Sequence, residues 1–165
     1  MTAGSRATGR ARRTGTAPRR AGRGLAYPDP VPRLLVDASN VMGSRPDGWW
    51  RDRTGARIRL TVELDEAADT VCARLLGDRR ADVVVVHDGR PIEMQLLRVH
   101  VRFAGHADDL LVDLAAPGDV VVTSDRELAR RVEASGATTV GSGTLVRLLR
   151  DAAVAGTPRR DVAGE

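Results

Sequence analysis

The sequence predicts an α/β fold, a three-layer α/β/α sandwich built on a mainly parallel sheet. Short apolar runs rich in valine and leucine recur at 34–36, 83–86 and 120–122, and helical patterns separate them. Runs of this kind are typical of strands that are buried on both faces, as the strands of parallel sheets are. A strand followed by a helix and then by another strand indicates right-handed crossovers that place helices on both faces of the sheet.

The elements follow one another in a regular order. The first strand is predicted at 33–36, and a loop containing glycine, proline and tryptophan extends from it to about residue 55. A helix is predicted from Thr61, as its N-cap, to Leu76, with Gly77 ending it. Further strands are predicted at 82–87, 97–103, 120–123 and 138–140, and further helices at 108–115, 125–135 and 144–154.

The length of 165 residues fits one domain, which we place at residues 31–155. Residues 1–30 contain seven arginines and a single acid, Asp29, without hydrophobic periodicity, and we expect a disordered Arg-rich tail. Such a tail either attracts nucleic acid electrostatically or is a dispensable leader. Residues 156–165 are expected to form a disordered C-terminal tail.

Composition narrows the class of protein. All 26 basic residues are arginine, a bias that a GC-rich genome also produces, so it is weak evidence for phosphate recognition. The lone cysteine, Cys72, lies at helical spacing among apolar residues and is predicted to be a core thiol. No apolar stretch approaches the ~18 to 20 residues of a membrane span, and no signal peptide is visible. We therefore expect a cytoplasmic protein with no membrane partner.

Aspartates occur where the predicted strands end. Asp37, Asp88 and Asp125 each follow a strand, and the pair Asp108-Asp109 opens a helix. Because the carboxyl ends of parallel strands meet at one edge of the sheet, we expect these side chains to gather there. Several uncompensated carboxylates repel one another and favour a hard divalent cation. This pattern predicts a metal-dependent enzyme that acts on phosphodiester bonds.

Each acid also has a purely structural explanation. Asp37 and Asn40 could form a turn that leaves the strand, although Asn40 could instead orient a metal or a ligating carboxylate. Asp108 and Asp109 could cap a helix, but that role needs only one of them. Asp88 precedes a glycine, as in an ordinary turn.

A capping box is predicted at the start of the helix 125–135. Ser124 would be the N-cap and Glu127 would reach back to it, which leaves the carboxylate of Asp125 free to face the sheet edge.

Both tryptophans lie in one loop, next to the predicted acidic edge. Trp49 and Trp50 stand among Arg45, Arg51 and Arg53. Aromatic and arginine side chains together suit stacking on unpaired bases and contacts to phosphates. The alternative is that one tryptophan packs on the core, leaving at most one for RNA.

Several motifs together resemble a known family. These are Asp37-x-x-Asn40, Asp88-Gly89, Ala107-Asp108-Asp109 and the segment from Val121 to Leu128, which reads VVTSDREL. In order and spacing they resemble the PIN-like NYN domain, and in particular the small bacterial YacP-like proteins, over about residues 33–150. The resemblance implies a Mg²⁺- or Mn²⁺-dependent endoribonuclease that leaves a 5′-phosphate and a 3′-hydroxyl. It assigns catalytic roles to Asp37, Asn40, Asp108, Asp109 and Asp125, and metal binding to Asp37, Asp88, Asp108, Asp109 and Asp125.

Two other functions use the same residues. A non-catalytic RNA-binding module of this fold would bind RNA without cleaving it, and a small-molecule phosphohydrolase would use the same acids on nucleotides. Phosphate-binding glycine loops, dinucleotide fingerprints and nucleophile elbows are absent from the sequence.

Overall fold

The computed structural model describes residues 31–156. The predicted tail 1–30, and all of 156–165 except Gly156, lie outside the described residues. The strands are β1 (Leu34–Asp37), β2 (Val83–Asp88), β3 (Val99–Ala104), β4 (Val120–Val122) and β5 (Thr138–Val140). The helices are α1 (Ala38–Gly43), α2 (Arg53–Leu75), α3 (Ala107–Leu114), α4 (Arg126–Glu133) and α5 (Ser142–Gly156), with a 3₁₀ turn, η1 (Trp49–Arg51).

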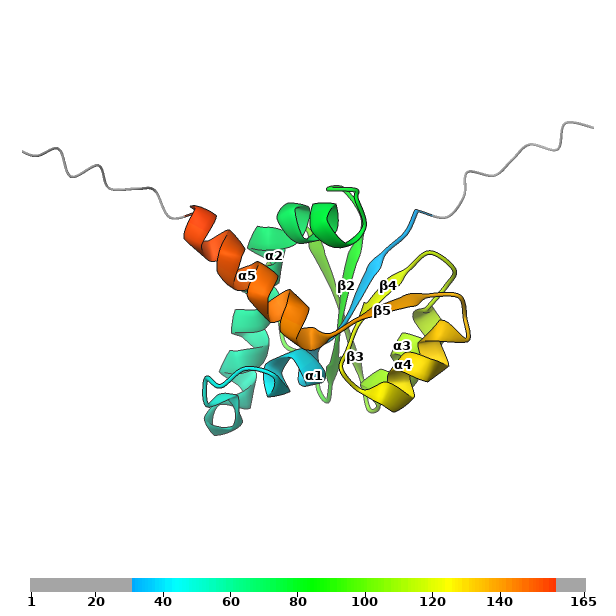
Figure 1. Cartoon of the computed structure of the whole chain (residues 1–165). Helices are drawn as coiled ribbons and strands as arrows, with labels where there is room; N and C mark the ends of the chain where they lie inside the picture. The colour runs from blue at the N-terminus through cyan, green and yellow to red at the C-terminus, as the bar shows by residue number, and fades with distance from the viewer. Residues whose placement is uncertain (1–30, 157–165) are drawn as a thin grey trace, which may run out of the picture.

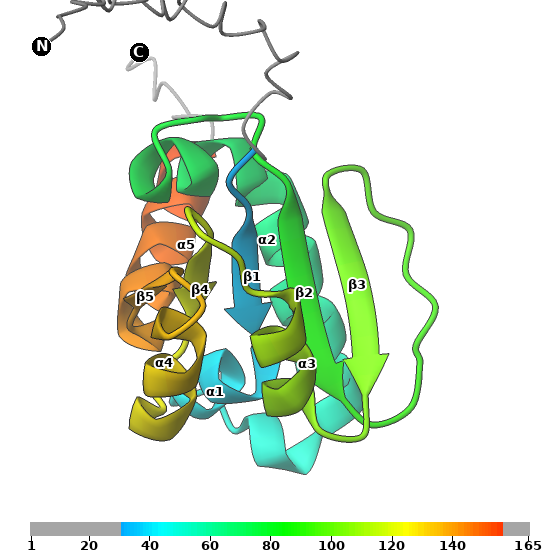
Figure 2. The same cartoon turned by 90° about the vertical axis from the view of Figure 1, so that its right-hand side faces the viewer.

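The five strands form one parallel sheet in the order β3-β2-β1-β4-β5, with β1 in the middle. Helices α2 and α5 cover one face of the sheet, whereas α3 and α4 cover the other (Figure 1). The predicted three-layer fold is therefore confirmed. Since every strand runs in the same direction, their carboxyl ends share one edge, where α1 also lies (Figure 2).

Alternate residues of each strand enter different halves of the core. Leu34 and Val36 pack towards α2 and α5, while Leu35 packs towards α3 and α4, and all three are fully buried. This burial on both faces explains why the strands lack the polar alternation of a half-exposed sheet. Cys72 is buried in the α2 side of the core, as predicted, and burial raises the pKa of its thiol to about 11.

Helix α2 begins at Arg53, earlier than the predicted Thr61. Its N-cap is Asp52, whose carboxylate accepts a hydrogen bond from the backbone N–H of Gly55 at 2.8 Å. The glycine and the surrounding arginines masked the helical pattern, yet Ala56 and Leu60 are buried on its core face. None of the helices within residues 31–156 has the length and apolar character needed to span a membrane.

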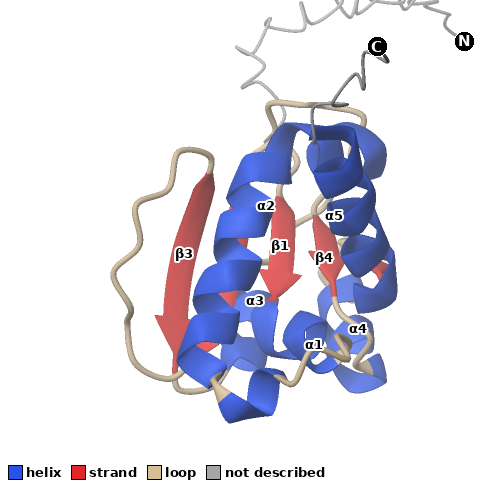
Figure 3. Ribbon diagram, turned by 90° about the vertical axis from the view of Figure 1, so that its left-hand side faces the viewer, coloured by secondary structure: helices blue, strands red, loops and turns tan. Residues whose placement is uncertain are grey.

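The carboxylate of Asp65 attaches the start of the edge strand β3 to α2, beside which the strand lies in Figure 3. Asp65 accepts hydrogen bonds from three successive backbone N–H groups, those of Leu97 (3.0 Å), Arg98 (2.7 Å) and Val99 (2.8 Å). Burial acts to raise the pKa of Asp65, but the three amide donors outweigh it and the pKa is lowered. The start of β3 is therefore positioned by α2 as well as by β2.

We predict that Asp65→Ala destabilises the protein by about 1–3 kcal/mol, because it leaves three amide donors without their acceptor. The midpoint of thermal unfolding measures the effect. Asp69→Ala, which removes only the exposed partner of Arg98 one turn later, is the control and should have a much smaller effect. Equal effects of the two variants would contradict the assignment.

Candidate active site

The centre of the candidate site is Asp37, the last residue of β1. Its carboxylate is only 3% exposed. One oxygen accepts a hydrogen bond from the backbone N–H of Asn40 and the other accepts one from the hydroxyl of Thr123, both at 3.1 Å. Burial raises the pKa of Asp37 to about 6, although these two hydrogen bonds oppose the shift, and the nearby Asp108 and Asp88 raise it further.

Asp88 ends the neighbouring strand β2 and does more than start a turn. Its two oxygens accept hydrogen bonds from the hydroxyl of Ser39 (2.7 Å) and from the backbone N–H of Ala107 (2.9 Å). The second bond caps the first residue of α3, whose preceding residue, His106, supplies no side-chain cap. Asp88 therefore joins the first turn of α1 to the start of α3.

The structure separates the two acids of the pair Asp108-Asp109. Asp108 faces the other acids: burial raises its pKa, and the charges of Asp125 and Asp88 raise it further, although the charge of Arg131 partly opposes them. Asp109 is exposed and pairs with Arg131 at 2.6 Å, which lowers the pKa of Asp109. Only Asp108 is thus placed with the carboxylates at the ends of the strands.

Asp125, and not Ser124, caps α4, so the predicted capping box is wrong. One oxygen of Asp125 accepts from the backbone N–H groups of Glu127 (2.7 Å) and Leu128 (3.1 Å). The other oxygen has no hydrogen bond within residues 31–156 and remains available to a ligand. The hydroxyl of Ser124 instead accepts a hydrogen bond from the backbone N–H of Ser142 at 2.9 Å.

Asn40 holds two loops together at this edge. Its side-chain oxygen accepts hydrogen bonds from the backbone N–H of Ser124 (2.8 Å) and from the hydroxyl of Ser142 (2.6 Å). Because that oxygen is already used, Asn40 positions the loop that leads to Asp125. Nothing in the sequence pointed to Ser142, since a serine between two glycines is ordinary in a loop.

The acids of the cluster have no cationic partners in the described part of the chain. The five ion pairs there involve other carboxylates, those of Asp119, Glu63, Asp52, Asp69 and Asp109. Asp119, which is also buried, shows the contrast, because Arg33 lies 2.7 Å away from it. Four carboxylates at one edge that form no ion pair within residues 31–156, namely Asp37, Asp88, Asp108 and Asp125, provide the hard oxygen donors that Mg²⁺ and Mn²⁺ prefer.

The chemistry of this donor set fits a divalent cation, but its spacing is not that of a finished metal centre. Within residues 31–156 no three His, Cys, Asp or Glu side chains are grouped closely enough to hold an ion. The acids interact through their charges across the edge, and ligation requires their side chains to turn towards a common point.

The tryptophan loop places its two rings differently. Trp49 packs against the core and carries the guanidinium of Arg53 over its ring at 5.4 Å, whereas Trp50 is 59% exposed. The two rings meet edge to face, with centroids 6.2 Å apart. Trp50 is therefore the ring that is free to stack on a base, and Arg51 next to it is exposed.

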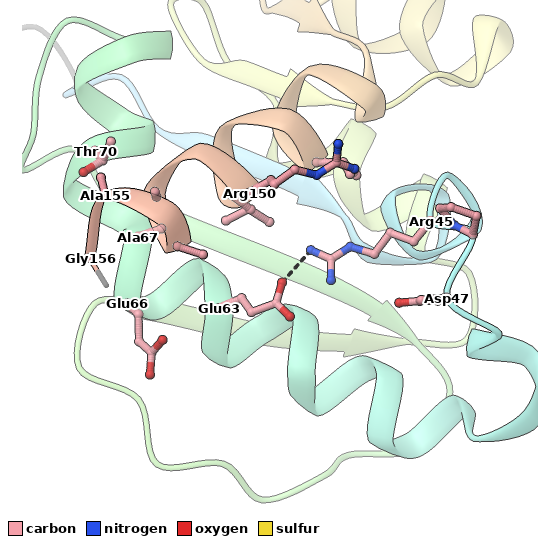
Figure 4. A pocket seen from close by; sticks show the side chains of 14 residues that line it. Arg45, Asp47, Glu63, Glu66, Ala67, Thr70, Arg150, Ala155 and Gly156 are labelled. Carbon is pink, nitrogen blue, oxygen red and sulfur yellow. Dashed lines mark ion pairs between the residues drawn. The ribbon is translucent and has the colours of Figure 1, made fainter. Parts of the chain in front are cut away.

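Arg45 lies in a different environment from the other arginines of that loop. It pairs with Glu63 at 2.8 Å inside a groove of about 910 Å³ between α2 and α5 (Figure 4). None of the clustered acids lines this groove. The structure thus engages Arg45 with α2 and does not direct it to the acidic edge.

Two crystal structures of Rae1 (YacP) from Bacillus subtilis are similar to this structure. One, of a point mutant, has a TM-score of 0.58 at 22% sequence identity over 75% of this chain and 78% of that chain. The other has a TM-score of 0.54 at 23% identity over 74% and 76%. No protein-family model and no curated protein matches the sequence. The predicted resemblance to YacP-like proteins is confirmed as a shared fold.

We predict that Asp37→Asn stabilises the metal-free protein at pH 8. The pKa of Asp37 in the folded protein, about 6, is above its ordinary 3.8, so the folded state holds this proton more tightly than the unfolded chain does. The resulting stability is complete below ~pH 4 and is lost as the pH rises through ~6. The neutral asparagine should recover about 1–3 kcal/mol at pH 8.

Thermal unfolding in EDTA at pH 4, 6 and 8 tests this difference between the variant and the wild type. The gain should grow with pH, because asparagine resembles the protonated acid. A variant that is less stable than the wild type at pH 8 would show that the ionised carboxylate is well compensated.

Proposed function

We propose that this protein is a Mg²⁺- or Mn²⁺-dependent endoribonuclease. The observation that carries the proposal is the cluster of four carboxylates without cationic partners at the carboxyl edge of a parallel sheet, in a fold shared with Rae1 (YacP). Asp37 is buried without a cationic partner among the described residues, and the exposed Asp88, Asp108 and Asp125 lie near it at the ends of the strands. Carboxylates that repel one another in this way favour binding of a cation.

Asp37, Asp108 and the free oxygen of Asp125 are the ligands we assign, with Asp88 beside them. When bound, one or two cations would activate water and offset the charge that develops on the phosphate. The other residues act through position. Thr123 directs one oxygen of Asp37, and Asn40 fixes the loop that carries Asp125.

The proposal is tested by incubating the full chain with single-stranded and structured RNAs in Mn²⁺, Mg²⁺ or EDTA. Cleavage that requires the metal and leaves 5′-phosphate ends supports it. Binding without cleavage would identify an RNA-binding module, and hydrolysis of nucleotides but not RNA would identify a small-molecule phosphohydrolase.

Asp125→Asn should reduce metal-dependent cleavage at least ~100-fold while the protein stays folded. Asparagine caps a helix as well as aspartate does, so α4 keeps its cap and only the negative charge is lost. Asp52→Asn makes the same change at the N-cap of α2, outside the cluster, and should leave cleavage unchanged. Full activity of Asp125→Asn in a pure preparation would remove Asp125 from the site.

The two tryptophans of the loop are predicted to have different roles, Trp50 in RNA binding and Trp49 in stability. Trp50→Ala should weaken binding of single-stranded RNA by about 1–3 kcal/mol, because an exposed ring is lost from a stacking surface. Its effect on the melting temperature should be small, since it removes only the edge-to-face contact with Trp49. Trp49→Ala should instead destabilise the fold by about 1–3 kcal/mol, because its ring packs on the core. Unaltered affinity in Trp50→Ala would exclude stacking by this ring.

A further inference from the structure

Arg57, in the first part of α2, reaches the same edge of the sheet as the acids. Its guanidinium lies over the ring of Phe103 at 5.3 Å and donates a hydrogen bond to the backbone carbonyl of Arg90 at 3.2 Å. Phe103 is near the end of β3, and Arg90 follows the turn after Asp88. Arg57 is close enough to Asp88 for that negative charge to act on its pKa.

Only part of the Arg57 guanidinium has hydrogen-bond partners in the described part of the chain. Its Nε is buried and has no hydrogen-bond partner, and Arg57 belongs to none of the ion pairs among residues 31–156. Arg59, two residues later, shows the usual arrangement, because it pairs with Asp52. Burial lowers the pKa of Arg57, and the nearby Asp88 only partly opposes this effect.

The contacts of Arg57 hold it in place without neutralising it. The ring of Phe103 is itself stacked on His87, with centroids 5.7 Å apart, and His87 is fully buried. The main chain of Arg57, and not its guanidinium, is also linked to His87, because the Thr61 hydroxyl donates to the backbone carbonyl of Arg57 (2.8 Å) and meets Nε2 of His87 at 2.9 Å. A guanidinium held in this way loses little further freedom when it binds a planar or tetrahedral anion.

We propose that Arg57 binds a phosphate group of the RNA, next to the acidic site and on its Asp88 side. The inference rests on the proposed function and extends it by naming a substrate-binding residue outside the tryptophan loop. Phosphate suits the position, because the guanidinium offers several N–H donors in one plane and carries a full charge. The carboxylates beside it would discourage an anion unless a cation neutralises them, so phosphate and metal should bind cooperatively.

The test uses Arg57→Gln, Arg57→Lys and the control Arg74→Gln in the full chain. Arg74 is exposed and lies on the same helix, about 25 Å further along it, so its replacement removes the same charge away from the edge. Affinity for a single-stranded oligoribonucleotide is measured at several salt concentrations, both in EDTA and in Ca²⁺ added as the divalent cation, and the effect of Arg57→Gln should be larger in Ca²⁺. Steady-state cleavage is measured in Mn²⁺, and melting temperatures accompany both.

Arg57→Gln should weaken RNA binding about 10- to 100-fold and raise KM, because one charge-assisted contact is lost. The slope of log affinity against log salt should fall by about 0.7, the value for one phosphate contact to a single strand. Arg57→Lys keeps the charge without the planar fork and should lie between wild type and Arg57→Gln. Arg74→Gln should match the wild type in all of these measurements.

The outcomes separate this inference from the proposed function. If the wild-type protein binds RNA without cleaving it, and Arg57→Gln weakens that binding, the phosphate contact is supported and the proposed nuclease activity is overturned. Metal-dependent cleavage with wild-type affinity, salt slope and KM in both Arg57 variants would overturn the contact and leave the nuclease standing. The phosphate contact would also be overturned if Arg57→Gln lost affinity only because it unfolds below the assay temperature, while Arg57→Lys stayed folded and bound RNA like the wild type.

Discussion

The ionised carboxylate of Asp37, buried at the end of the central strand, is the constraint on which the rest of the site depends. A buried charge needs hydrogen bonds or a counterion, and here the described residues supply hydrogen bonds alone. Those bonds come from Asn40, after β1, and Thr123, after β4. Asn40 in turn binds Ser124 and Ser142, so the loops after three neighbouring strands are held by contacts that start from one carboxylate.

The two buried aspartates at opposite ends of the strands, Asp37 and Asp119, differ in their partners. At the amino edge, Asp119 accepts hydrogen bonds from the backbone and side chain of Arg33, and its charge is compensated. At the carboxyl edge, Asp108 and Asp88 raise the pKa of the buried Asp37, and Asp125 and Asp88 raise that of Asp108. The nearby guanidinium of Arg57 contacts a ring and a backbone carbonyl and no carboxylate of the described residues. The carboxylates and the guanidinium of Arg57 thus lie near one another without forming an ion pair. This arrangement lowers the stability of the fold and leaves the carboxylates available to a cation and Arg57 available to an anion.

Much of the fold follows from local patterns in the sequence. Every predicted strand is present to within two residues at each end, because valine-rich runs followed by aspartate identify strands buried on both faces. The starts of two helices were predicted less accurately. The N-caps of α2 and α4 are Asp52 and Asp125, whereas the sequence favoured Thr61 and Ser124, since several hydroxyl and carboxylate side chains compete for the same role.

The sequence was sufficient to predict that the acids after the strands lie at one edge, because parallel strands end together, and Asp37, Asp88, Asp108 and Asp125 do lie at the ends of strands or the starts of the helices that follow them. Which of the predicted acids form ion pairs depended on the tertiary structure. It turned Asp109 towards Arg131 and Arg45 towards Glu63, and it left Arg57 beside the cluster. The reason is physical: local sequence specifies the direction of a strand or the start of a helix, whereas the partner of a charged side chain depends on residues from distant parts of the chain.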